Sequence, residues 1–435
     1  MRITSPRSGS RVRLDEINLA DINLYTSGDA HLVWQTLRAE RPVFWQAQPA
    51  GQGFWAVTRQ ADVRRVLAEH QTFTSENGTA IAMLGGPDPA AGLMMHSTDP
   101  PRHGLFRQHL VKPFSTHTVA AYARQVRSFV RDAMCPALDG DVWDAADSFA
   151  RLPMAVGAMM MGLPETDIEP LLRLSYASLA PHDPKYSSGS ARATSASAHY
   201  SIIRYFTEFI AKRRQNLSAD LVSHLLTVEV GGRLLTDEEI LLNCLSLLLG
   251  AVVTTSQAIS ATLIALVEQH DGEGHWPRTA PVQTAVEEAL RWSSPVTHFM
   301  RRARHDIEMH GERIQAGDAV TAWIASANRD ETVFERPYTL DLERSPNRHI
   351  AFGNGPHRCI GNNLARLMVQ ESFEELIARI ESFELAGPPC HLVSNEIAGV
   401  VSLPLKLNLR TPESGPGGTR RPGRPADARA TRLSA

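Results

Sequence analysis

The sequence predicts a mainly α-helical fold with a small β-rich lobe, and three observations favour it. After His103 most of the chain has the spacing of apolar residues that is typical of buried helix faces. One long apolar run, Ile240–Val253, follows Thr236 and Glu239, which stand three residues apart as in a capping box. Short segments rich in aromatic and β-branched residues occur near the N-terminus and again after Pro295.

Composition limits the classes of protein to consider. The chain has 435 residues, of which 43% are hydrophobic and 21% charged, so it can bury a large core. The net charge of −3 gives no field for nucleic acid or an anionic membrane, and neither partner is expected. The first 13 residues contain no apolar segment typical of a signal peptide, and Ile240–Val253 is shorter than the roughly 18 residues of a membrane span. We therefore expect a soluble, cytoplasmic protein.

The N-terminal part is expected to contain a hairpin, a helix and a long loop. Val43–Gln46 and Phe54–Thr58 are predicted strands on either side of a Pro- and Gly-containing turn. Ala61–Glu69 is a predicted helix. Ser75–Met95 has little periodicity, and a loop of this length is usually functional or disordered.

The middle of the chain is expected to be helical. The predicted helices are Leu105–Leu110, Val119–Met134, Ala155–Met161 and Ile202–Leu217. Ala180–His199, rich in Ser, Ala and Pro, is predicted to be a mobile surface connection. The helix that begins after Thr236 is predicted to continue to about Glu268 and, being apolar nearly all round, to pass through the middle of the molecule.

The C-terminal part alternates short strands and helices. The predicted elements are a helix at Val282–Trp292, β segments at His305–His310 and Ala319–Ile324, a Gly-rich loop at Ala351–Gly361 and a helix at Asn362–Ile380. Residues 411–435 are mostly Pro, Gly, Arg and Ala and cannot bury a core. We therefore divide the chain into a flexible N-terminus (1–14), a single domain (15–410) and a disordered tail (411–435).

The Gly-rich loop carries the residues most suited to chemistry. Gly353, Gly355 and Gly361 surround Cys359 directly before a predicted helix, whose N-terminal N–H groups favour a thiolate. His357 and Arg358 add donors beside it. Such a thiolate is a metal ligand or a nucleophile, whereas an isolated Cys would more often be an ordinary buried residue.

The complete ten-residue pattern from Phe352 to Gly361 resembles the haem-binding loop of the cytochromes P-450. In that family Phe-Gly-x-Gly-x-His-x-Cys-x-Gly carries the axial cysteine, and every fixed position is present here. The resemblance covers about residues 15–410. It implies the cytochrome P-450 fold, haem b (iron protoporphyrin IX) as cofactor, Cys359 as the iron ligand, and Phe352, Gly353 and Gly361 beside it.

Other segments resemble the residues that hold the haem propionates in this family. The run Asp99-Pro-Pro-Arg-His103-x-x-x-Arg107 is similar to the start of its C helix, where the His and the Arg bind propionates. Arg301 resembles a further propionate-binding Arg, and His357 completes the set. Taken singly, each could be a solvated surface residue; together they imply a cationic cage for two carboxylates.

Glu288-Ala289-Leu290-Arg291 resembles the Glu-x-x-Arg of the family's K helix and implies a buried structural pair. A second Arg is expected to join this pair. Thr339 stands where many relatives have that residue, so the partner is either Arg336 or Arg344.

The apolar run would then be the I helix, with Gly250, Ala251, Val253, Thr254 and Thr255 at the positions of the oxygen-binding stretch. Small residues let dioxygen and substrate approach, and Thr254 can bond a backbone carbonyl. Val253 replaces the acid that relatives usually have there.

The resemblance implies a haem-thiolate monooxygenase that inserts one oxygen atom from O₂ into a small organic substrate, free or carrier-bound. We expect the tailoring of a secondary metabolite. Since the sequence contains no flavin or nicotinamide segment, electrons are expected from an external ferredoxin and ferredoxin reductase. The cations expected to dock an acidic ferredoxin are Arg107, Lys112, Arg358 and Arg366.

The substrate pocket is expected, by family position, to contain Met83, Leu84, Leu93, Met94, Val252, Val296, Phe299 and Val400. A Met and Leu set is also typical of plain core. Two alternatives remain open: a haem-thiolate enzyme with atypical chemistry (peroxide-driven, coupling or nitrogen oxide use) and a non-catalytic haem- or substrate-binding protein.

Overall fold

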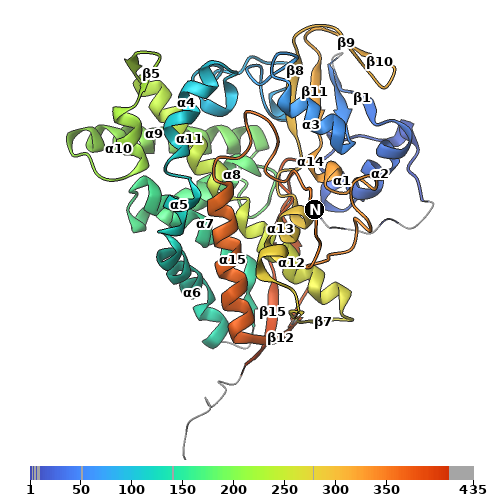
Figure 1. Ribbon diagram of the computed structural model, residues 1–435, viewed down its shortest axis with the longest axis vertical. Coiled ribbons are helices and arrows are strands. Elements are labelled where there is room, and N and C mark those ends of the chain that lie inside the picture. Colours follow the sequence, from blue (N-terminus) through green and yellow to red (C-terminus); the bar gives the residue numbers. More distant parts are fainter. Residues whose placement is uncertain are drawn as a thin grey trace, which may run out of the picture.

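A body of long helices forms one side of the molecule, and a β-rich lobe lies at its upper right in Figure 1. The structure is a computed structural model that describes residues 1, 3, 6, 10–49, 52–139, 142–277 and 279–410. The predicted tail, 411–435, lies outside the described residues, as do parts of the predicted flexible N-terminus, 1–14, of which Met1 is buried. The prediction of a mainly α fold with a small β-rich lobe is confirmed.

Helices account for most of the regular structure. The longer ones are α2 (Ala30–Glu40), α3 (Gln60–Ala68), α4 (Arg102–Val111), α6 (Ala123–Asp139), α7 (Ala145–Met161), α8 (Ile168–Leu179), α9 (Ala191–Gln215), α11 (Asp237–Val252), α12 (Thr255–Gln269), α13 (Val282–Ser293) and α15 (Asn362–Arg379). Short helices are α1 (Asn23–Thr26), α5 (Thr116–Ala120), α10 (Leu221–Thr227) and α14 (Ile324–Ala327), with 3-10 turns η1 (Leu14–Glu16), η3 (Ile81–Met83), η4 (Met95–Ser97) and η5 (Glu165–Asp167).

The lobe is built on a five-stranded sheet that joins early and late parts of the chain. Its order is β1 (Val43–Ala47), β2 (Gly53–Val57), β11 (Ala319–Ala322), β8 (Phe299–Ala303) and β3 (Phe73–Thr74). β1 and β2 form the predicted antiparallel hairpin. β11 lies parallel to β2, with Ala319 opposite Phe54.

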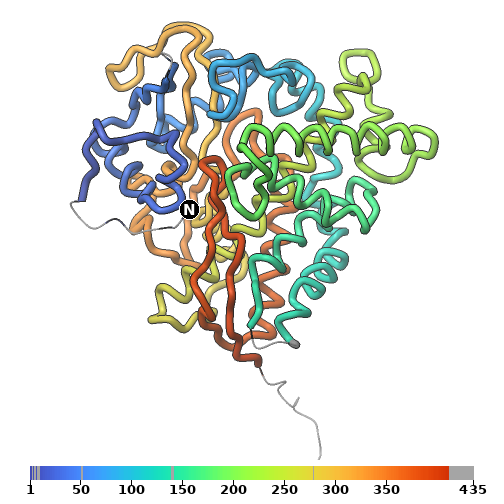
Figure 2. Tube along the Cα trace, turned by 180° about the vertical axis from the view of Figure 1, so that it is seen from behind, coloured from blue at the N-terminus to red at the C-terminus, as the bar shows by residue number. Residues whose placement is uncertain are grey.

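Smaller sheets complete the β structure. The four-stranded sheet has the order β4 (Trp143–Asp144), β15 (Pro404–Leu409), β12 (Ile380–Leu385) and β7 (Glu273–Gly274). The strand pairs are β5 (Glu229–Val230) with β6 (Arg233–Leu234), β9 (Ile307–Met309) with β10 (Glu312–Ile314), and β13 (Cys390–His391) with β14 (Val400–Ser402). From behind, the C-terminal strands run down the centre between the blue lobe and the green helices (Figure 2).

Several helix predictions were wrong in their limits, among them Ala155–Met161, whose helix α7 begins already at Ala145. Ala180–His199 was expected to be a surface connection, but α9 already begins at Ala191, where the Ser190 side chain accepts the Ala193 N–H at 3.2 Å. The alanines of this segment favour the helix. Val119–Met134 was expected to be one helix but is divided into α5 and α6.

The predicted central helix begins as expected but is not continuous. Thr236 and Glu239 form the predicted capping box, with the Glu239 N–H donated to Thr236 at 3.2 Å and the Thr236 N–H donated to Glu239 at 2.8 Å. The helix is interrupted at Val253 and Thr254, which separate α11 from α12. The span Asp237–Gln269 is long and apolar enough to cross a membrane, but 67% of its most apolar window is buried inside the protein, which is typical of a core helix.

The largest apolar core lies among the helices, and two smaller clusters fill the lobe. α12 packs against α7, α13 and α15, so the central helix is surrounded by other helices. α15 stands in front of this group in Figure 1. The Gly-rich loop that precedes α15 is therefore held against the centre of the helical body.

Candidate active site

The Cys359 loop is held in a fixed shape by backbone contacts. Gly353 and Gly355 have φ angles of +74° and +73°, which other residues rarely adopt. A Cβ on Gly355 would lie 2.5 Å from the Ala68 Cα, so the loop packs closely against the end of α3. The Cys359 N–H donates to the Phe352 carbonyl at 2.8 Å, which closes the loop directly before α15.

The Cys359 thiol is accessible although protein surrounds it on most sides. Its side chain is exposed, yet burial is the largest cause that raises the pKa of Cys359. The Gly361 N–H and the charges of Arg107, Arg358 and Arg366 act in the opposite direction, as expected at a helix N-terminus. The surrounding protein therefore favours the neutral thiol, and a bound cation is needed to hold the thiolate.

Three of the predicted propionate-binding residues are brought together. The rings of His103 and His357 have centroids 4.3 Å apart, and burial lowers the pKa of His103 to about 4. Burial, Arg301 and His103 lower the pKa of His357 to about 2. Burial also lowers the pKa of Arg301 to about 10, and among the described residues no carboxylate forms an ion pair with its guanidinium. The group is thus rich in donors, and the charge of Asp99 acts on it without an ion pair to Arg301.

Arg107, the fourth predicted propionate-binding residue, lies one turn after His103 on α4. It is half-buried and donates to the Arg358 carbonyl at 2.7 Å, and its charge is one of those that act on Cys359. Its charge also helps to lower the pKa of His103, so Arg107 acts on both the thiol loop and the group formed by His103, His357 and Arg301.

Asp99 organises the start of α4, a role that the sequence did not indicate. The Ser75 hydroxyl donates to Asp99 at 2.7 Å, and Thr74 and Arg304 also donate to it. Burial alone would raise the pKa of Asp99, but these donors hold it below its usual value. The Ser75 hydroxyl lies 3.3 Å from His357 Nε2, so this network also positions the histidine pair.

The break in the central helix lies at the predicted oxygen-binding stretch. Thr254 donates its hydroxyl to the Gly250 carbonyl at 3.4 Å, and the Gln257 N–H donates to the Thr254 carbonyl at 3.2 Å. Gly250 is exposed, Ala251 and Thr254 are partly exposed, and a Cβ on Gly250 would meet nothing within 4 Å. Val253 and Thr255 are buried, so they face packed side chains.

The predicted pocket residues divide into two groups. Met83, Leu84, Leu93, Val296 and Phe299 are partly exposed, whereas Met94, Val400 and Val252 are buried. Val252 has no exposed surface, because its side chain points into the core cluster formed by α11, α12 and their neighbours. This packing therefore does not support the prediction that Val252 lines the substrate pocket.

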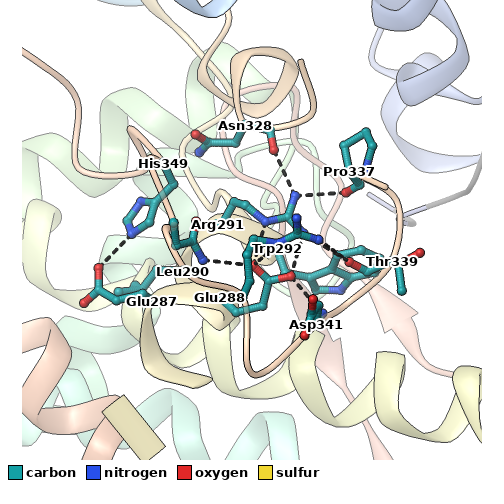
Figure 3. Close-up of polar contacts among 12 residues, drawn as sticks. Glu287, Glu288, Leu290, Arg291, Trp292, Asn328, Pro337, Thr339, Asp341 and His349 are labelled. Atoms are coloured by element: carbon teal, nitrogen blue, oxygen red, sulfur yellow. Dashed lines mark hydrogen bonds and ion pairs between the residues drawn. The ribbon is translucent and has the colours of Figure 1, made fainter. Parts of the chain in front are cut away.

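Glu288 and Arg291 form a buried ion pair on α13 (Figure 3). Arg291 also donates to the carbonyls of Asn328 and Pro337 at 3.0 and 2.9 Å. Arg344 donates to Glu288 at 3.1 Å, so of the two candidates for the third member it is Arg344 that contacts the pair.

Arg336 lies 3.9 Å from Asp341 and is exposed. Burial alone would raise the pKa of Glu288, but Arg291, the Asp341 amide and Arg344 hold it below its usual value.

A second carboxylate next to this pair engages one of the predicted docking cations. Glu287 accepts from Arg366 at 2.6 Å and from His349 at 2.9 Å. Burial alone would raise the pKa of Glu287, but these two donors lower it to about 2. Arg366 is therefore committed to a partly buried ion pair with Glu287, while Lys112 and Arg358 are exposed.

Two polar side chains that no sequence pattern indicated also border the interior. His96 is exposed, yet burial lowers its pKa to about 4, and its Nδ1 lies 3.1 Å from the Ser246 hydroxyl on α11. Glu396 is partly exposed, yet burial raises its pKa to about 7. Neither stands in a recognisable motif, because the contacts that place them are between distant segments.

Comparison with known proteins gives a consistent result. A family model described as "Cytochrome P450" matches residues 173–272 and 281–407. The chain is 34% identical over 409 residues to "Cytochrome P450 NovI" of Streptomyces niveus, a match that covers 91% of this chain and 97% of that protein.

Solved structures give the same result. "P450 OxyD that is involved in the Biosynthesis of Vancomycin-type Antibiotics" superposes with a TM-score of 0.79 at 32% identity, covering 91% of this chain and 100% of the other. "P450BioI in complex with hexadec-9Z-enoic acid ligated Acyl Carrier Protein" superposes with a TM-score of 0.74 at 26% identity, covering 86% and 97%.

Proposed function

The chain belongs to the cytochrome P-450 family, whose members are haem-dependent monooxygenases, and from this premise we propose that it tailors a secondary metabolite with electrons from an external ferredoxin. The substrate is a small organic molecule, free or attached to a carrier, and one oxygen atom from O₂ is inserted into it. The observation that carries the proposal is the Cys359 thiol, which a glycine-shaped loop holds at the N-terminus of α15 and which is accessible although protein surrounds it on most sides.

The residues of the site fit haem b. Arg301 is buried and forms no ion pair among the described residues, although the charge of Asp99 acts on it, and His103 and His357 lie beside each other, so two propionates would find donors there. A thiol whose pKa burial raises needs a bound cation to become a thiolate, and iron would supply it. Haem, when bound, supplies the chemistry of O₂ reduction and oxygen insertion, which no side chain can perform.

The chain's own residues bind, orient and exclude water. Cys359 would hold the iron, with the Gly361 N–H and nearby arginines stabilising the thiolate charge. The Thr254 hydroxyl, bonded to the Gly250 carbonyl, would hold a proton beside the substrate. Val253 carries no proton, so the other member of a proton relay must come from elsewhere.

Three observations support the proposed partners and substrate class. NovI and OxyD are similar over nine-tenths of this chain, and the OxyD structure belongs to antibiotic biosynthesis. P450BioI binds an acyl carrier protein, which supports a carrier-bound substrate as one form. Arg358 is exposed within the thiol loop and Lys112 at the C-terminal end of α4, and both would contact an acidic ferredoxin. We also propose a cytoplasmic location.

An isotope experiment tests the function. Candidate metabolites are screened by the optical shift of the haem protein, and those that bind are incubated with ferredoxin, its reductase, NADPH and ¹⁸O₂. We expect a product with one ¹⁸O atom. A product without ¹⁸O would contradict oxygen insertion, and optical shifts without any product would identify a binding protein.

The valine at position 253 favours one second candidate. This candidate is a P-450 enzyme that uses peroxide in place of O₂ and electrons, or that carries out coupling or nitrogen oxide chemistry. Turnover supported by hydrogen peroxide without ferredoxin, at a rate above that of the reconstituted system, would favour this candidate.

A further inference from the structure

His96 is an exposed residue in a segment whose neighbouring side chains are buried. Met94 and Met95 before it are 6% and 8% exposed, and Ser97 and Thr98 after it are 1% and 0% exposed. The His96 side chain is exposed although it belongs to the same short turn, η4. The turn therefore packs its other side chains into the protein and leaves the imidazole facing open space.

The backbone on the N-terminal side of His96 is fixed to α11 by the buried side chain of Asn243. The Met95 N–H donates to Asn243 Oδ1 at 3.0 Å, and Asn243 Nδ2 donates to the Leu93 carbonyl at 3.0 Å. The same Nδ2 donates to the Glu239 carbonyl, one turn earlier on α11, at 2.7 Å. Because the amide contacts both α11 and this segment, the fold sets the direction in which the imidazole points.

The imidazole lies over the accessible face of α11. His96 Nδ1 is 3.1 Å from the Ser246 hydroxyl, and Ser246 and Gly250 share one face of the helix because they are four residues apart. A Cβ on Gly250 would meet nothing within 4 Å, so the space over this face is open. The Thr254 hydroxyl bonds to the Gly250 carbonyl at 3.4 Å. His96 therefore borders open space one helical turn from the predicted oxygen-binding stretch.

The second ring nitrogen of His96 is available to a ligand. Among the described residues none forms a hydrogen bond with Nε2. Burial lowers the pKa of His96 to about 4, so the imidazole is neutral near pH 7. The negative charge of Asp88 and the positive charge of Arg301 also act on the ring, in opposite directions. These surroundings therefore favour neither an anionic nor a cationic ligand.

We propose that His96 is a specificity-determining residue of the substrate site, that its Nε2 binds a hydroxyl group of the substrate, and that Ser246 is the positioning residue that orients the ring. The proposal rests on the proposed function, since it concerns the substrate of the same site. A neutral imidazole has one donor and one acceptor nitrogen, and a serine hydroxyl can pair with either. A ligand hydroxyl matches Nε2 in both tautomers, whereas an ammonium group or a carboxylate matches only one. The substrate class is therefore a neutral alcohol or phenol.

The test removes the hydroxyl from the probe and the imidazole from the protein. 3-Phenylpropan-1-ol, 4-phenylbutan-1-ol and 5-phenylpentan-1-ol are titrated into the haem-loaded protein by calorimetry and optical spectroscopy, beside the three fluorides in which fluorine replaces the hydroxyl. The hydroxyl preference is the Kd of the fluoride divided by the Kd of the alcohol. For at least one chain length, this preference should be about fivefold larger in wild type than in His96→Phe, which corresponds to one neutral hydrogen bond.

Two further variants separate recognition from folding. His96→Gln keeps a donor and an acceptor and should retain part of the preference. Ser246→Ala keeps the imidazole but removes its orienting partner, so the preference should fall while fluoride binding stays unchanged. His305→Phe, at an exposed position between β8 and β9, is the matched control and should leave all affinities unchanged.

A hydroxyl preference that is equal in wild type and His96→Phe at all three chain lengths would overturn the proposal. So would equal weakening of alcohols and fluorides in His96→Phe, or a wild type that binds none of the probes. An undiminished preference in Ser246→Ala would also overturn it, and that variant decides the outcome if His96→Phe does not bind haem.

The spectrum of the reduced, CO-bound protein separates this result from the proposed function. If that spectrum lacks the thiolate band, the proposed function fails, whereas the calorimetric preference still decides the role of His96.

Discussion

Arg291 donates two hydrogen bonds of 2.7 Å to the two carboxylate oxygens of Glu288, and neither side chain has any exposed surface. The Glu288 carboxylate also accepts hydrogen bonds from the Asp341 N–H, from Arg344 and from the Asn347 side-chain amide. Two charges removed from water in this way are stable only while all of these partners are present.

Removal of Glu288 should therefore destabilise the protein severely. Glu288→Ala leaves Arg291 as an uncompensated buried charge, at a cost of about 3–5 kcal/mol in the free energy of unfolding. Urea unfolding and haem content measure the effect, with the exposed Glu343→Ala as the control variant. A Glu288→Ala protein with the melting temperature and haem content of wild type would show that the pair is not structural.

Removal of the Cys359 thiol should abolish the spectrum of the reduced, CO-bound protein that thiolate ligation gives, together with all oxygenase activity. Cys359→Ala leaves the backbone of the loop unchanged, since its N–H bond to Phe352 does not involve the side chain. Cys135→Ala, at an exposed position on α6, should keep both properties. If Cys359→Ala retained the thiolate band, another residue would have to be the ligand.

Acid should destabilise the fold through buried histidines. Burial lowers the pKa of His298 to about 3, below its ordinary value of 6.5, so the unfolded chain takes up a proton first as the pH falls. The stabilisation that comes from keeping His298 neutral is fully present above pH 6.5. Below that pH it is lost, and the free energy of unfolding falls by roughly 2 kcal/mol between pH 7 and pH 5. In His298→Phe, the free energy of unfolding measured with urea should fall less between pH 7 and pH 5, by about that amount. An equal fall in both proteins would indicate that His298 is not buried in neutral form.

The valine at position 253 leads to a prediction about coupling. If a polar group of the substrate completes the proton relay, analogues without that group should bind but divert electrons to peroxide or water. Val253→Asp should then raise the ratio of product to reductant consumed for the poor analogues more than for the true substrate. It should also lower the melting temperature, because Val253 is buried.

The control for this prediction is Val253→Asn, which has the shape of the aspartate without its acid and should not improve coupling. Equally high coupling for all analogues in the unmodified enzyme would rule out assistance by the substrate.

Local signals predicted the fold better than they predicted the site. The start of α11 could be predicted from Thr236 and Glu239, because a capping box depends only on residues close in sequence. The break at Thr254 was missed, because it depends on a side-chain bond to the Gly250 carbonyl within an otherwise uniform apolar run.

Contacts between distant segments explain the other differences. Arg344 rather than Arg336 reaches Glu288 because the turn between them directs the two side chains apart, with Arg336 at a φ of +45°. Val252 was assigned to the pocket by family position alone, and its orientation depends on how α11 packs. Glu396 has no sequence signal, since its surroundings come from loops about 100 and 300 residues away.

The parallel pairing of β2 with β11 has a consequence for biosynthesis. The Thr321 hydroxyl donates to the Trp55 carbonyl, and the two residues are 266 positions apart. At elongation rates of about 5–20 residues per second the ribosome needs roughly 13 to 53 s to make that length of chain. During this interval β1 covers one edge of β2, while the other edge has no strand to pair with and is open to aggregation. Nascent chains interrupted before Ala319 would keep that edge unpaired, which makes them natural clients of chaperones and proteases.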